Sequence, residues 1–157
     1  MDDEFVLRFV PSSAWLIHDE AGRATLSTAA FPAEELEGKR DKSISVLRGM
    51  TPPPEIQRRA GSRNLEPGWK SDPVAARAVV QKLRALQDAS GRREICVNAD
   101  PTTDRLGPCP THASILRSVP PRDPSPRTER AKLRFALTRI FADLAHISGS
   151  AVGEPAP

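Results

Sequence analysis

The chain has 157 residues and a net charge of +3, and 38% of its residues are hydrophobic. Its two cysteines are too few for a disulfide framework, and no apolar run approaches the roughly 20 residues of a membrane-spanning helix. The 16 prolines and nine glycines stay below the share expected of a disordered, low-complexity chain. The composition therefore predicts one domain with a small core and many fixed turns.

Charge is distributed unevenly along the chain. Residues 48–93 hold ten basic and four acidic residues, a balance that could meet an acidic partner or phosphate groups. Residues 1–4 are acidic and lack the basic and apolar stretches of a secretory signal. We therefore expect a cytoplasmic protein whose two cysteines are reduced.

The first third of the chain carries strand signals. Residues 5–10 are apolar enough for a buried strand. Residues 15–18 and 24–27 flank an Asp-Glu-Ala-Gly turn and predict a hairpin, and residues 44–47 predict a short strand.

Helical spacing appears in three later segments. A short helix is predicted over 53–60, with Thr51 as its cap. A long helix is predicted over 73–89, ended by Gly91, and a second over 126–147. The apolar stripe of the first long helix is Ala76, Val79, Val80, Leu83 and Leu86, and that of the second is Leu133, Leu137, Ile140, Phe141 and Leu144.

Strands are predicted at 94–97 and 112–116, whereas residues 31–43 and 99–111 lack periodicity and are expected to form long loops. This order predicts a single α+β domain over residues 1–148, followed by a flexible tail at 149–157. We expect a mixed, mostly antiparallel sheet with the two long helices packed on one face.

The segment from Asp100 to Ala113 is the most unusual stretch, because three prolines restrict it and it delivers Cys109 and His112 to the start of a strand. Three interpretations compete. His112 could pin the preceding loop by bonding its backbone, as histidines at strand starts commonly do. It could instead act in a small enzyme with Asp100, Arg48 or Cys109, although no orienting third group is evident.

A metal site is the third interpretation. Four residues, Cys96, Cys109, His112 and His18, offer ligand types that zinc accepts, but their spacing matches no standard finger. Our expectation is therefore no metal and no cofactor.

Partner binding is the function that the pattern favours most. His112 could line a cleft with neighbouring charged groups, and the arginines of the middle region offer a basic surface. The candidate partner-binding residues are Arg48, Arg58, Arg59, Arg77, Arg84, Arg105 and His112.

Three segments together resemble a group of small uncharacterised bacterial proteins with segments of the S-x-A-F, S-V and P-x-H-A-x-I type. They are residues 26–31, residues 43–48, and Asp100-Pro101 with residues 110–115. No activity is assigned to that group, so the resemblance implies no catalytic residue and only draws attention to Phe31, Ser45 and His112.

The sequence thus leads to one main hypothesis and two alternatives. The main hypothesis is a non-catalytic protein-interaction module that binds a larger partner. The first alternative is a nucleic-acid-binding protein using the Arg-rich middle region, although only Trp69 could stack on bases there. The second alternative is a small enzyme centred on His112.

Overall fold

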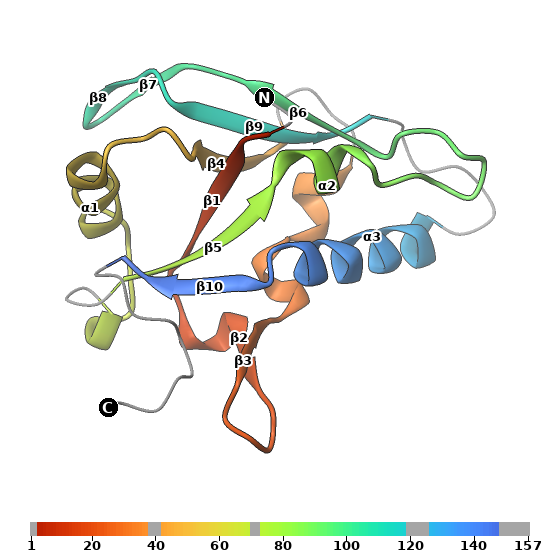
Figure 1. Cartoon of the computed structure of the whole chain (residues 1–157), viewed down its shortest axis with the longest axis horizontal. Coiled ribbons are helices and arrows are strands. Elements are labelled where there is room, and N and C mark those ends of the chain that lie inside the picture. Colours follow the sequence, from red (N-terminus) through yellow and green to blue (C-terminus); the bar gives the residue numbers. More distant parts are fainter. Residues whose placement is uncertain (1–2, 38–41, 70–72, 119–125, 148–157) are drawn as a thin grey trace.

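The computed structural model describes residues 3–37, 42–69, 73–118 and 126–147. A six-stranded antiparallel sheet, with strand order β10-β5-β1-β4-β9-β6, forms its centre (Figure 1). The six strands are β1 (Phe5–Val10), β4 (Ile44–Arg48), β5 (Val74–Val79), β6 (Ile95–Ala99), β9 (His112–Arg117) and β10 (Asp143–His146). The predicted α+β class is confirmed, and every strand pair is antiparallel.

Smaller elements surround the sheet. Two hairpins are formed by β2 (Leu16–His18) with β3 (Ala24–Leu26) and by β7 (Thr102–Asp104) with β8 (Gly107–Cys109). The helices are α1 (Pro53–Gly61), α2 (Val80–Arg84) and α3 (Pro126–Ile140), with short 3-10 turns at Ser13–Trp15, Thr28–Ala30, Ala33–Leu36 and Pro67–Trp69. Among the described residues, no helix has the length and apolar character needed to cross a membrane.

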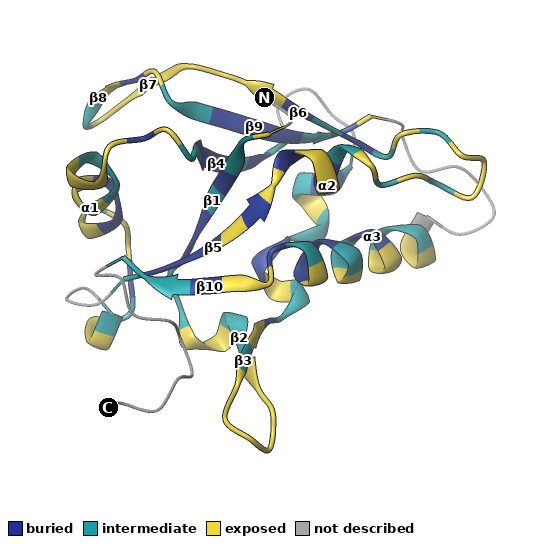
Figure 2. Cartoon of the chain, viewed as in Figure 1, coloured by how far each residue is buried: buried dark blue, intermediate teal, exposed yellow. Residues whose placement is uncertain are grey.

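One face of the sheet carries the main core. Because side chains alternate along a strand, Val6 and Val10 of β1 point to the same face as Ile44 and Val46 of β4. The predicted residues Leu133, Leu137 and Phe141 pack against this face, and α3 covers it together with α2 and the 3-10 turns. Figure 2 shows buried residues on the central strands and an exposed tip on the β2–β3 hairpin.

The opposite face is covered only in part. Its cluster of buried apolar residues contains Phe9, Leu47, Ala75, Ala60 of α1 and Cys109 of β8. Helix α1 and the β7–β8 hairpin lie on this side, away from α3 (Figure 1). The half-covered face leaves room for pockets beside α1.

The predicted helix over 73–89 is wrong, because its first half is strand β5 and only Val80–Arg84 is helical. The run Val-Ala-Ala-Arg-Ala-Val fits the two-residue period of a strand as well as the period of a helix. Strand β1 pairs with all six of its residues. Gly91, with φ +78°, does not end a helix. It lies in the turn between Gln87 and Arg93, which pair as an isolated antiparallel β-bridge. The sheet partners therefore decided the conformation. Of the two long helices expected on one face, only α3 exists.

The predicted helix over 126–147 ends early, at Ile140. Residues 143–146 form β10, which pairs with β5 from Asp143 opposite Arg77 to His146 opposite Val74. Leu144 was predicted to belong to the apolar stripe of the helix. It is buried in the core, but as a residue of strand β10.

The segment 99–111, expected to be a loop, contains the β7–β8 hairpin, whose turn includes Gly107 at φ +99°. The expected loop at 31–43 contains a 3-10 turn at Ala33–Leu36. Thr51 does not cap α1, because Pro52 is the N-cap residue. The Thr51 hydroxyl donates instead to the Arg48 carbonyl. The predicted tail, 149–157, lies outside the described residues.

Candidate functional site

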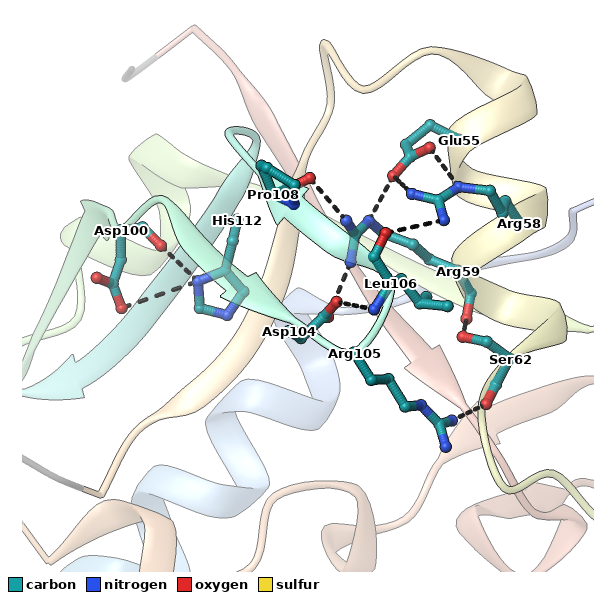
Figure 3. Close-up of polar contacts among 10 residues, drawn as sticks. All are labelled: Glu55, Arg58, Arg59, Ser62, Asp100, Asp104, Arg105, Leu106, Pro108 and His112. Carbon is teal, nitrogen blue, oxygen red and sulfur yellow. Dashed lines mark hydrogen bonds and ion pairs between the residues drawn. The ribbon is translucent and has the colours of Figure 1, made fainter.

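Helix α1 and the β7–β8 hairpin are joined by the side chain of Arg59 (Figure 3). Its guanidinium donates to Glu55 at 2.6 Å on its own helix, and to Asp104 at 2.9 Å and the Pro108 carbonyl at 3.1 Å on the hairpin. Arg59 is only 5% exposed, so these bonds are largely shielded from water. The hairpin is therefore held at a set position over the sheet.

The charges of this link nearly cancel. Arg58 also donates twice to Glu55, at 2.8 and 2.9 Å, and once to the Leu106 carbonyl. Hydrogen bonds from Arg58 and then Arg59 lower the pKa of Glu55 to about 2. The pKa of Asp104 is lowered first by the backbone N–H of Leu106 and then by Arg59. Two guanidiniums thus face two carboxylates.

A pocket of about 540 Å³ opens between α1 and this hairpin, and we call it the basic pocket. Phe9, Leu47 and Cys109 form its apolar part. Its polar lining is Arg59, Ser62, Arg63, Asn64, Thr102, Asp104, Arg105 and His112. Three arginines against one aspartate make the lining cationic.

Two of these arginines form no ion pair with a carboxylate among the described residues, although Arg63 is attracted electrostatically by Asp104. The Arg63 guanidinium stacks over the Phe9 ring, 5.2 Å from its centre, and Arg105 donates to the Ser62 carbonyl. Neither contact neutralises a charge. The excess positive charge of the pocket therefore comes from Arg63 and Arg105.

His112 forms the wall of the basic pocket opposite α1. Its Nδ1 lies 2.7 Å from the Asp100 carbonyl oxygen and 3.8 Å from that residue's carboxylate. Because a carbonyl only accepts, Nδ1 carries the hydrogen and donates. This is the loop-pinning contact of the structural interpretation (Figure 3).

The residues of the enzyme alternative are brought together only in part, since Asp100 contacts His112 and Cys109 lines the same pocket, whereas Arg48 does not. Asp100 accepts a 2.6 Å hydrogen bond from Ser114, so the carboxylate lies between hydroxyl and imidazole, whereas a triad needs the imidazole in the middle. Arg48 is paired with Glu4, at 2.8 and 3.1 Å. Arg48 also follows the alternation of Val46, on the face opposite Leu47 and its cross-strand neighbour His112. Cys109 lines the pocket but is buried among apolar side chains.

The four residues considered for metal binding are dispersed. His18 lies on the exposed β2–β3 hairpin, and the Cys96 sulfur contacts the Ser118 hydroxyl at 3.1 Å on the edge strand β6. Cys109 and His112 lie at the basic pocket. Across the described ranges, no three His, Cys, Asp or Glu residues could hold a metal ion together.

The candidate partner-binding residues divide into groups. Arg59, Arg105 and His112 line the basic pocket, and Arg58 bonds to its hairpin. Arg84 lies elsewhere and donates to the Val97 carbonyl of β6 at 2.7 Å. The pocket also uses residues that sequence reasoning missed, such as Asp104 and Phe9. An Asp-Arg-Leu-Gly turn between short extended runs could have predicted the hairpin.

A second pocket, of about 330 Å³, lies on the other side of α1 and is lined mainly by apolar groups from α1, β1, β5 and β10. Arg77, the remaining candidate, lies at its border. This arginine forms an ion pair with Asp143 and stacks over the Phe5 ring at 4.8 Å. The charge of Arg77 is therefore compensated.

The fold and site define the protein as an antiparallel α+β protein, with one six-stranded sheet, two small hairpins and a basic pocket on the half-covered face of the large sheet. Comparisons with protein-family models, with curated proteins and with solved structures found no match.

Proposed function

We propose that this chain is a non-catalytic protein-interaction module, in which the basic pocket binds an acidic segment of a larger partner protein. The observation that carries the proposal is the pair of cations at one pocket, Arg63 and Arg105, that form no ion pair with a carboxylate among the described residues. Guanidinium groups bind carboxylates with two parallel hydrogen bonds, so acidic side chains complement this lining.

The surroundings of the pocket favour binding without rearrangement. The buried Arg59 ties the hairpin to α1, and the His112 Nδ1 bond holds the segment that enters the hairpin. A site that is already ordered loses less conformational entropy on binding. This supports a preformed recognition surface.

The basic middle region favours protein over nucleic acid as the partner. Arg58 and Arg59 are paired with acidic groups at α1, Arg77 with Asp143, and Arg92 with Asp88. These pairs are spread over separate elements, whereas nucleic-acid binding needs unpaired cations along one face with stacking aromatics. The binding experiment described below therefore includes a nucleic acid, so that this alternative is tested directly.

We also propose a cytoplasmic location. Cys96 and Cys109 are both free thiols in different elements, and a reducing compartment keeps such thiols reduced.

The test measures fluorescence anisotropy of a labelled ten-residue peptide alternating Glu and Gly, beside a Lys–Gly peptide and a single-stranded oligonucleotide. We expect the Glu peptide to bind, and the double variant Arg63→Glu, Arg105→Glu to weaken it at least about tenfold, because two attractive contacts become repulsive. Arg23→Glu is the control, since Arg23 is highly exposed on the far β2–β3 hairpin.

Equal binding of the Glu peptide to the wild type and the double variant would contradict the proposal. So would tighter binding of the oligonucleotide with a steep loss between about 50 and 200 mM salt, which would support the nucleic-acid alternative.

A further inference from the structure

The outward side of α3 carries positive charge and one exposed aromatic ring. Lys132 and Arg139 are exposed there, on either side of Phe135, which is 58% exposed (Figure 2). The only acidic residue of α3 is Glu129, and it forms an ion pair with the buried Arg117. No carboxylate of this helix therefore compensates the charges of Lys132 and Arg139.

A pocket of about 410 Å³ opens at the C-terminal end of this side of α3. Its charged lining consists of Arg77 and Asp143, which pair with each other, and of Lys82 and Arg139. Lys82 and Arg139 form no ion pair among the described residues, and Arg139 instead lies over the Phe135 ring, 5.8 Å from its centre. The C-terminal end of a helix contributes only about half a negative charge, so two full positive charges outweigh it.

We infer that this surface docks an α-helix of a partner protein that presents acidic residues on both sides of an apolar residue. We call the surface the α3 patch and define it as Lys82, Lys132, Phe135 and Arg139. Charge complementarity selects the acidic residues, and the exposed ring of Phe135 selects the apolar one. Because α3 and α1 lie on opposite faces of the sheet, the inference goes beyond the proposed function and uses no residue of the basic pocket.

The shape and chemistry of the α3 patch favour a helix over an extended segment. Lys132, Phe135 and Arg139 are three and four residues apart, so they form one line along a convex surface. Cations and an aromatic ring offer no good acceptor to the backbone N–H groups of an extended chain, whereas a helix satisfies its own. Ala131 and Ala136 flank Phe135 and are small, so a second helix can approach to the usual distance of about 8–10 Å.

The number of aromatic side chains favours protein over nucleic acid at this surface. Sites for single-stranded nucleic acid combine a positively charged groove with aromatic side chains on which successive bases stack. Phe135 is the only aromatic residue of α3, and it projects from a convex helix. One apolar contact with charged groups around it matches the centre and rim of a protein interface instead.

The experiment measures the fluorescence anisotropy of labelled, alanine-based helical peptides of about 17 residues, a length at which such helices form. The acid probe has a central leucine, with one glutamate four residues before it and one four residues after it. A neutral probe has glutamine in place of glutamate, and a serine probe has serine in place of leucine. We expect the neutral probe to bind about tenfold more weakly than the acid probe, because charge-assisted contacts are lost.

Substitutions assign the binding to the α3 patch. Arg139→Glu and Lys132→Glu should each weaken binding of the acid probe about tenfold, because an attraction becomes a repulsion. Arg23→Glu makes an equal change of charge on the exposed β2–β3 hairpin and should leave the affinity unchanged. All three side chains are exposed, so thermal melts followed by circular dichroism should stay close to the wild type.

A double-mutant cycle tests the apolar contact. Phe135→Ser should weaken binding of the acid probe several-fold and leave binding of the serine probe unchanged, because the ring and the leucine contact each other. Equal effects on both probes would overturn the inference, as would equal binding of the acid and neutral probes or no binding of the acid probe.

Two further outcomes would also overturn the inference. If Arg63→Glu, Arg105→Glu weakens binding of the acid probe as much as Arg139→Glu does, the probe binds in the basic pocket, and the proposed function stands while this inference fails. If a single-stranded oligonucleotide binds more tightly than the acid probe and loses that affinity in Arg139→Glu, the α3 patch is a nucleic-acid site.

Discussion

Arginine side chains act as cross-links in this protein. Arg59 joins α1 to the β7–β8 hairpin through two acceptors, Asp104 and the Pro108 carbonyl. The buried Arg8 donates to the carbonyls of Ser45 and Ala30 and to Glu35. A guanidinium suits this use because it has five donors in one plane and remains charged. Arg63 and Arg105 stand out because neither forms an ion pair with a carboxylate in the described part of the chain.

Gly49 is required by a close approach to β1. A Cβ at this position would lie 2.8 Å from the Phe5 carbonyl oxygen and 2.7 Å from the Phe5 ring, and the Gly49 N–H already bonds to that carbonyl. We expect Gly49→Ala to lower the free energy of unfolding by about 1–3 kcal/mol, measured by urea denaturation.

Gly61 is the matched control, because a Cβ there meets no atom within 4 Å and the residue ends α1. Gly61→Ala should raise the free energy of unfolding by about 0.4–1 kcal/mol. If Gly49→Ala left the free energy of unfolding unchanged, β1 would have to shift away from position 49 to make room for the added methyl group.

At the scale of elements, α1 is held to the sheet as much by charge as by packing. Only Ile56 and Ala60 of this helix join the apolar cluster, whereas Arg58 and Arg59 link the helix to the hairpin. The sequence predicted α1 within one residue at its end, because the prolines and the helix lie in one local segment. It could not predict the partner, since Asp104 lies 45 residues beyond Arg59.

Acid should loosen this element. The pKa of Glu55 is lowered from 4.5 to about 2 in the folded protein. Its ionised carboxylate therefore stabilises the fold fully at pH values above the pKa of about 4.5 that the group has in the unfolded chain. That contribution is lost as the pH falls from about 4.5 toward 2. Thermal unfolding at pH 5 and pH 2.5 should show a smaller acid-induced decrease in melting temperature for Glu55→Gln than for the wild type.

The control for this measurement is Glu20→Gln, on the exposed turn of the β2–β3 hairpin. It should follow the wild-type curve. Parallel curves for Glu55→Gln and the wild type would contradict the proposed role of the carboxylate.

At the scale of the whole molecule, the sheet separates a large core from a small one. Among the residues that the structure describes, the core under α3 contains 21 buried residues, whereas the cluster beneath α1 and the hairpin contains five. The free energy of local opening follows the apolar surface that each part buries. The face that carries α1 and the β7–β8 hairpin is therefore expected to be the less stable side of the molecule.

Hydrogen exchange followed by mass spectrometry should detect this difference. We expect amides of α1 and the β7–β8 hairpin to exchange faster than those of β1 and β5, which lie inside the sheet. Exchange from α1 as slow as from β5 would show instead that both faces open only on global unfolding.

The sequence by itself determined the α+β class, strand β1, the β2–β3 hairpin, α1 and the apolar stripe of α3 as far as Phe141, because each of these is encoded by a local pattern. Only the tertiary structure decided that residues 74–79 and 143–146 are strands. Residues 74–79 are Ala- and Val-rich and residues 143–146 number only four, so both runs fit either periodicity; pairing of the first with β1 and of the two with each other selected the extended form. The basic pocket is likewise tertiary, because Phe9, Arg63, Arg105 and His112 meet only when the hairpin folds over the sheet.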